Sequence, residues 1–125
     1  MRPGFIDMFS GAGLFSAGMI AAGFDPVMAI DLAPDAIESY RRNISTNALV
    51  GSVTDERDIP KATALIAGPP CQGFSTLGRR DPLDQRNSLS LAVLPWVDRS
   101  EAQLVVVENV PPFLRSSHWA ALRDG

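Results

Sequence analysis

Cys71, the only cysteine of the sequence, is the residue best suited to do chemistry. It lies in the segment Gly68-Pro69-Pro70-Cys71-Gln72-Gly73-Phe74-Ser75, where two prolines restrict the backbone that leads to the thiol. A lone cysteine is usually a small buried hydrophobic residue, but this setting favours a nucleophile. The thiol must ionise to act, and Arg79 and Arg80 are candidates for the positive environment it needs. With one histidine, His118, in the chain, a metal site made of several Cys and His ligands is excluded.

Glu108 is the second candidate for chemistry, because it follows the very apolar run at 104–107 and precedes Asn109-Val110. A carboxyl group at the end of a buried strand is desolvated, which would let it hold a proton near neutral pH and act as an acid. The alternative interpretation is a helix cap or a surface acid. We expect the chemical role.

The segment Phe9-Ser10-Gly11-Ala12-Gly13 is a candidate ligand-binding turn, because it follows an apolar run and precedes a predicted helix. Backbone N–H groups and the positive end of a helix can hold an anionic group there. Asp31 lies twenty residues after Gly11, a spacing that brings an acid from a second strand to ribose hydroxyls. Ser16 stands where a dinucleotide-binding fingerprint has its third glycine, so a mononucleoside such as S-adenosylmethionine fits better. The alternative is a tight turn and an aspartate that only caps the next helix.

These residues need a scaffold that brings them together, and the apolar runs and turn residues predict strands that alternate with helices. Continuous apolar strands indicate a parallel sheet covered by helices on both faces, with ligands bound beyond the carboxyl ends of the strands. The candidate turn, Asp31, Cys71 and Glu108 all follow predicted strands. The expected strands cover 5–9, 27–30, 64–67 and 104–107, the last being the most convincing buried strand, with a short one at 50–53; the expected helices cover 14–22, a segment from 34 onward, and 88–97.

Size and charge indicate one α/β domain over residues 1–125 and limit what it binds by itself. Apolar residues make up 46% of the chain and charged residues 20%, as in ordinary globular proteins. We expect no membrane segment and no secretory signal, and therefore a cytoplasmic location. The net charge of −3 supplies no basic surface of the kind that dominates nucleic-acid affinity. Most contacts to the phosphates of a nucleic acid would have to come from another source.

Three motifs in this order, Asp7-Met8-Phe9-Ser10-Gly11-Ala12-Gly13, the segment around Cys71, and Glu108-Asn109-Val110, resemble the DNA cytosine-C5 methyltransferase family. The resemblance implies a Rossmann-like, S-adenosylmethionine-dependent domain. Cys71 would be the nucleophile, Glu108 would contact the ring-nitrogen edge of cytosine, and Asn109 would help to shape that site. The cofactor site that the resemblance implies consists of Phe9, Gly11, Ala12, Gly13, Asp31, Leu32, Ser52, Val53 and Pro70.

Two positions depart from the family pattern, and both concern the cofactor. The family usually has glutamate at the end of the second strand, and Asp31 is one methylene group shorter. Ser52, with Val53 beside it, matches the position of an aspartate that contacts the adenine amino group. Asp55 or Asp58 would take that role only with a shift in the register of the loop.

The resemblance implies a covalent mechanism on a cytosine that is flipped out of the DNA duplex. The Cys71 thiolate would add to C6 while Glu108 supports N3, so that C5 attacks the methyl group of the cofactor. Loss of the C5 proton and elimination of Cys71 would release 5-methylcytosine.

The matching motifs are those of the front part of the family. We therefore expect a fold that is incomplete at the C-terminus, with the target-recognition region and closing motifs absent, either through truncation or because a second subunit carries them. Weak or no methylation by the isolated chain follows. Two alternatives are a tRNA cytosine-C5 methyltransferase of the same lineage and a non-catalytic module that binds a nucleoside.

Overall fold

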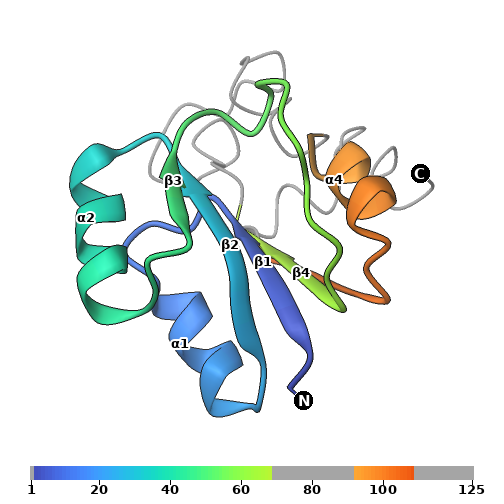
Figure 1. Ribbon diagram of the computed structural model, residues 1–125, viewed down its shortest axis with the longest axis horizontal. Coiled ribbons are helices and arrows are strands. Elements are labelled where there is room, and N and C mark those ends of the chain that lie inside the picture. The colour runs from blue at the N-terminus through green and yellow to red at the C-terminus, as the bar shows by residue number, and fades with distance from the viewer. Residues whose placement is uncertain (1, 69–91, 109–125) are drawn as a thin grey trace, which may run out of the picture.

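The computed structural model describes residues 2–68 and 92–108. They form a five-stranded sheet in the order β3-β2-β1-β4-β5, and every pair of neighbouring strands is parallel (Figure 1). Helices connect β1 to β2, β2 to β3 and β4 to β5. The elements are β1 (Gly4–Met8), α1 (Leu14–Ala21), β2 (Asp25–Asp31), α2 (Pro34–Asn43), β3 (Ala48–Val50), β4 (Ala64–Ala67), α4 (Val93–Ser100) and β5 (Leu104–Val107).

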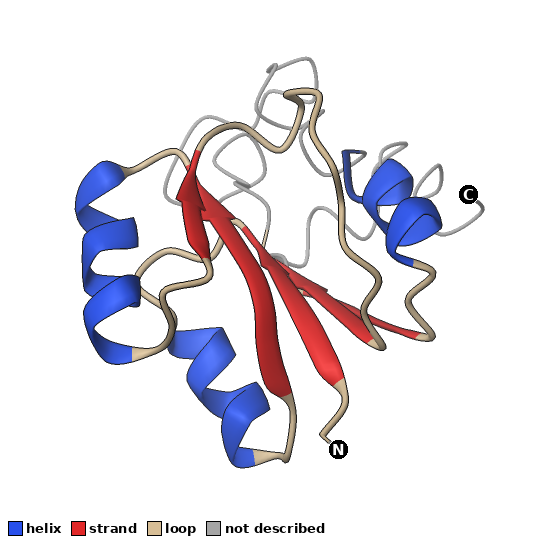
Figure 2. Cartoon of the chain, in the orientation of Figure 1, coloured by secondary structure: helices blue, strands red, loops and turns tan. Residues whose placement is uncertain are grey.

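Helices cover both faces of this sheet, as the sequence predicts (Figure 2). β1 lies at the centre, and its successive side chains point to opposite faces. Phe5 packs with Met19 of α1 on one face, whereas Ile6 and Met8 pack with Trp96 of α4 on the other. The first face continues over α2, where Ile37 and Tyr40 bury Ala29 and Ala48.

The C-terminal ends of two predicted elements lie three residues from where the structure has them. The short third strand spans Ala48–Val50 and not 50–53, because Ala48 is the residue buried under α2 and the chain turns after Val50. α4 ends at Ser100, three residues beyond the predicted end, because Trp96 and Ser100 continue its buried face and Glu101 then adopts a left-handed φ of 56°. Residues 88–91 of that predicted helix lie outside the described residues.

The burial predicted for β5 is wrong. Leu104, Val105 and Val106 are 43%, 40% and 36% exposed, although β5 pairs with β4 in the expected parallel register. A run of apolar residues indicates full burial only where both faces and both edges are covered, and β5 is the outermost strand of the described sheet. None of the helices in the described ranges combines the length and the apolar character needed to cross a membrane.

Candidate cofactor and active site

The carboxyl ends of β1, β4 and β5 surround a cavity of about 760 Å³, which lies within the size range of small-molecule sites. Its wall is formed by Phe9, Gly11 and Ala12 after β1, by Gly68 after β4, and by Glu108 after β5. The structure thus brings together three groups that are far apart in the sequence, as expected for residues that follow the carboxyl ends of parallel strands.

The turn after β1 is held in a conformation that suits close approach to a ligand. Phe9, Gly11 and Gly13 all have left-handed φ angles, of 57°, 56° and 105°. A Cβ at Gly13 would lie 2.6 Å from a side-chain carbon of Ile44 and 2.8 Å from the ring of Tyr40. Only glycine fits at position 13, both for its conformation and for the lack of space. Because Gly13 carries no side chain to cap α1, the first N–H groups of this helix are suited to a ligand group.

Asp31 ties the end of β2 to this turn. Its Oδ2 atom accepts a hydrogen bond of 2.8 Å from the N–H of Gly11, and its Oδ1 atom accepts one of 2.9 Å from the N–H of Ala33 at the start of α2. The two interpretations of Asp31, a ligand-binding acid and a helix cap, are therefore compatible. Each carboxylate oxygen retains a second lone pair with which it can accept a bond from a hydroxyl group. The neighbouring Leu32 is 63% exposed.

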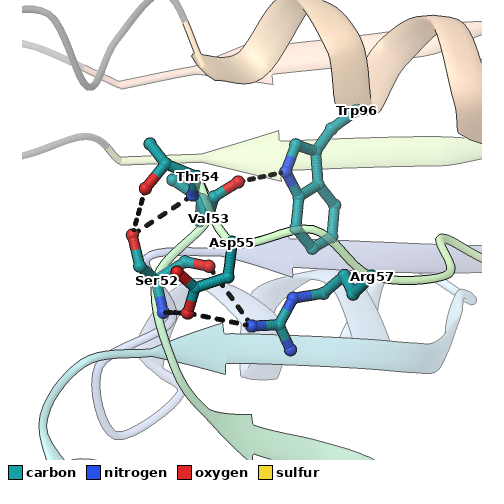
Figure 3. A network of polar contacts seen from close by, with 6 residues as sticks. All are labelled: Ser52, Val53, Thr54, Asp55, Arg57 and Trp96. Carbon is teal, nitrogen blue, oxygen red and sulfur yellow. Dashed lines mark hydrogen bonds and ion pairs between the residues drawn. The ribbon is translucent and has the colours of Figure 1, made fainter.

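The segment after β3 forms a polar network (Figure 3). The Ser52 N–H donates to Asp55 Oδ2 at 3.3 Å, and the Arg57 guanidinium lies 3.6 Å from the same carboxylate oxygen. Asp55 therefore lies beside Ser52 in the register that the structure has, without the shift that the sequence argument requires. The Val53 carbonyl accepts a 2.9 Å bond from the indole of Trp96, and the Val53 side chain is buried in the core on the α4 face.

These residues after β3 do not join the cavity described above. Among the described residues, the wall of that cavity includes neither Ser52 nor Val53, and the predicted cofactor residues Gly13, Asp31 and Leu32 are not part of it either. The burial of Val53 gives its side chain a packing role, while Ser52 is only half-buried. Their predicted contact with a cofactor stays a prediction.

Glu108 extends the pairing of β5 with β4, because its N–H donates to the Ala67 carbonyl at 2.9 Å. A Cβ built at Gly68 would lie 3.9 Å from Glu108 Oε2, so this carboxyl group lies beside the start of the Cys71 segment. Glu108 is exposed, and the desolvation expected for it is not found. Pro70, Cys71 and Asn109 lie outside the described residues.

A buried polar chain under the turn was missed by the sequence analysis. Asp7 is 1% exposed, and its Oδ2 atom accepts a 2.5 Å hydrogen bond from the Ser16 hydroxyl, which lies 2.8 Å from the hydroxyl of the fully buried Tyr40. Burial raises the pKa of Asp7 from 3.8 to about 7; the Ser16 bond opposes this and the charge of Asp31 adds to it. Burial also raises the pKa of Tyr40. The available signal was an aspartate in the middle of an otherwise apolar strand.

Comparisons with known proteins agree with this geometry. Two curated relatives are type II methyltransferases: M.DdeI of Desulfomicrobium norvegicum is 36% identical over 84% of this chain, and M.XorII of Xanthomonas oryzae pv. oryzae is 35% identical over 98% of it. The chain spans 27% and 32% of the lengths of these two relatives. Among solved structures, the Dnmt2 methyltransferase of S. pombe is similar over 98% of this chain and 41% of its own, with a TM-score of 0.73 and 25% identity.

The likeness to solved methyltransferase structures confirms the predicted Rossmann-like fold. The family model for C-5 cytosine-specific DNA methylases matches residues 4–124, and so covers the turn after β1, the Cys71 segment and Glu108 together. The chain belongs to the C-5 cytosine-specific DNA methylase family.

Proposed function

We propose that this chain binds S-adenosylmethionine and supplies the cysteine nucleophile for transfer of a methyl group to C5 of cytosine in DNA. The observation that carries the proposal is the shared cavity at the carboxyl ends of β1, β4 and β5, in a chain whose family model covers the motifs around it. The chain spans 27% of the length of M.DdeI and 32% of that of M.XorII, and we propose that the complete reaction needs a further polypeptide region that binds DNA.

The residues present fit the cofactor. The turn after β1 contributes Phe9, Gly11 and Ala12 to the cavity wall, and the first turn of α1 follows directly. The Asp31 carboxylate is fixed by two backbone N–H groups and is suited to ribose hydroxyls, while the ring of Phe9 forms part of the cavity wall. When bound, the cofactor supplies an electrophilic methyl group.

The chain's own residues prepare the cytosine to accept that methyl group. C5 of cytosine is a weak nucleophile, and addition of the Cys71 thiolate to C6 opens the C5–C6 double bond and makes C5 electron-rich. Glu108, which lies beside the start of the Cys71 segment, would stabilise the charge that this addition places on the ring at N3. After methylation, loss of the C5 proton restores the double bond and expels the Cys71 thiolate.

Cofactor binding is tested by titration calorimetry on the full chain. Asp31→Ala is expected to weaken S-adenosylmethionine about tenfold or more, because a hydrogen bond to a charged group contributes about 1.5–3 kcal/mol. Asp35→Ala is the matched control, since it removes the same type of side chain at an exposed position in the first turn of α2. Equal affinities in the two variants would contradict the assigned role of Asp31.

The chemical step is tested with DNA that contains 5-fluorocytosine, which blocks release of the cysteine after methyl transfer. We expect a covalent adduct, detected by mass spectrometry, when the chain is supplied with a polypeptide that carries a target-recognition region, and no adduct with Cys71→Ser. Substrates of duplex DNA and of tRNA distinguish the two nucleic acids. Cofactor binding without any adduct on either one would point to the non-catalytic module.

A further inference from the structure

Asp7 begins the first family motif, has no role in the proposed reaction so far, and contributes to the wall of the cavity. It lies in β1, the central strand, and forms part of the innermost wall beside Phe9 and Phe15. At 1% exposure it has almost no contact with solvent, so water cannot solvate its charge. A buried acid at the wall of a ligand cavity responds strongly to the charge of whatever occupies that cavity.

The hydrogen-bond chain from Asp7 can serve both protonation states. With Asp7 ionised, the Tyr40 hydroxyl donates to Ser16 and the Ser16 hydroxyl donates to Asp7. With Asp7 protonated, all of these donors reverse, and the Asp7 carboxyl group donates to Ser16. Because the Ser16 hydroxyl carries one proton and accepts another, Asp7 keeps a hydrogen-bond partner in either state. The fold therefore holds Asp7 in place without fixing its charge.

The charges around Asp7 oppose its ionisation. Asp31 at the end of β2 raises the energy of a negative charge at Asp7. Glu108 after β5 is a second acid on the wall of the same cavity, Tyr40 on α2 is neutral near pH 7, and the facing residues of β4 are apolar. Within residues 2–68 and 92–108, these neighbours bring no positive charge to Asp7. A cationic ligand in the cavity would supply the positive charge that these neighbours do not provide.

We propose that Asp7 makes this cavity prefer the positively charged sulfonium of S-adenosylmethionine over the neutral thioether of the product S-adenosylhomocysteine. This rests on the proposed cofactor site. The sulfonium attracts the ionised carboxylate across a medium of low dielectric constant, so Asp7 gives up its proton to solvent as S-adenosylmethionine binds. Transfer of the methyl group removes that positive charge, and Asp7 then takes a proton back. The two events favour entry of the cofactor and departure of the product.

The test compares both ligands by calorimetry on the full chain, between about pH 6 and about pH 7.5. An acid that binds the ligand only when ionised, and that titrates near pH 7, gives an affinity that rises up to about tenfold over this interval. We expect that rise for S-adenosylmethionine, together with net proton release measured in two buffers of different ionisation enthalpy. S-adenosylhomocysteine should show a clearly smaller rise and less proton release.

Two aspartate variants separate this role from general electrostatics. Asp7→Asn should remove the difference between the pH profiles of the two ligands, whereas Asp25→Asn should keep it. Asp25 lies at the opposite end of the sheet, exposed and paired with Arg2, so its substitution removes a carboxylate far from the cavity. If Asp7→Asn fails to fold, the deciding measurement is the proton release of the unmodified chain, compared between the two ligands.

The outcomes distinguish this proposal from the one on which it rests. Equal pH profiles and equal proton release for the two ligands would overturn the role of Asp7 and leave the cofactor site standing. Binding of neither ligand at any pH would overturn the proposed function, and the role of Asp7 with it.

Discussion

Two aspartates at the ends of neighbouring strands show how strongly the surroundings of a side chain determine its behaviour. Asp31 is half-buried, and each of its oxygens accepts a hydrogen bond from a backbone N–H. Asp7 is buried and has the Ser16 hydroxyl as its donor, so desolvation dominates and raises its pKa to about 7. The same residue type thus binds backbone N–H groups at the end of β2 and is a buried group with a raised pKa in β1.

Asp7→Asn tests this contrast through protein stability. Because the pKa of Asp7 is raised from 3.8 to about 7 in the folded chain, the folded state binds its proton more tightly than the unfolded state does. The contribution of Asp7 to the free energy of unfolding is fully present below about pH 4 and is lost as pH rises through about 7. The variant should lack this loss. Its free energy of unfolding should therefore rise by up to about 4 kcal/mol relative to that of the unmodified chain between pH 4 and pH 8.

Urea denaturation of both proteins across that pH interval makes the measurement. The quantity compared is the difference in unfolding free energy between variant and unmodified chain at each pH. A difference that stays constant from pH 4 to pH 8 would show that Asp7 titrates normally in the folded chain.

At the scale of elements, the turn between β1 and α1 is fixed from three sides. The Ser10 N–H donates to the Ile30 carbonyl at 3.0 Å, the Asp31 carboxylate holds the Gly11 N–H, and Gly13 packs on Tyr40 of α2. The position of the proposed cofactor therefore depends on β2 and α2 as much as on the turn itself. A change at any of these contacts should affect folding and ligand binding together.

Gly13→Ala should destabilise the chain by about 2–4 kcal/mol, because it combines overpacking with a positive φ. The matched control is Gly18→Ala in α1, where an added Cβ meets nothing within 4 Å. In the interior of a helix, alanine is more stable than glycine by about 0.5–1 kcal/mol, so this control should stabilise the chain. Thermal unfolding followed by circular dichroism measures both. A stable Gly13→Ala chain would mean that α2 does not press on the turn.

Which elements the sequence could predict depends on how local their signals are. The apolar runs at Ala64–Ala67 and Leu104–Val107 match β4 and β5 to the residue, since turn or polar residues bound them on both sides. β3 was misplaced because its register depends on Ala48 packing under α2, a contact between elements.

The candidate site divides in the same way. The turn after β1 and Asp31 could be predicted, because parallel strands end at one edge and the motif spacing is local. The chain from Asp7 through Ser16 to Tyr40 could not, since its members lie 9 and 24 residues apart and meet only when α1 and α2 pack on the sheet. The burial of Val53 against Trp96 could not be predicted either, because these two residues also meet only in the folded core.

At the scale of the whole molecule, the net charge of the chain and the share of its relatives' length that it spans lead to the same expectation about DNA binding. The net charge is −3, and Asp7, Asp31 and Glu108 gather at the carboxyl edge of the sheet, where the flipped base would have to enter. DNA is a polyanion whose affinity for proteins comes mainly from contacts to its phosphates. The chain spans 27% of the length of M.DdeI and 32% of that of M.XorII, so most of the length of these two relatives has no counterpart in it.

The isolated chain should therefore bind duplex DNA weakly, with a dissociation constant above about 10 µM at physiological salt. Fluorescence anisotropy with a labelled duplex measures it, and S-adenosylmethionine binding in the same preparation is the control for a folded chain. Submicromolar affinity that falls steeply with added salt would show that this chain carries a DNA-binding surface of its own.

Phe9 places its aromatic ring at the cavity wall with a φ of 57°, a backbone conformation that bulky residues rarely adopt. Such a conformation costs about 1–3 kcal/mol, which the rest of the fold must offset. Protein stability and ligand binding thus place opposite demands on position 9. Laboratory evolution toward heat resistance would gain by relaxing that backbone with glycine or asparagine, and each such gain would strip the aromatic surface from the pocket.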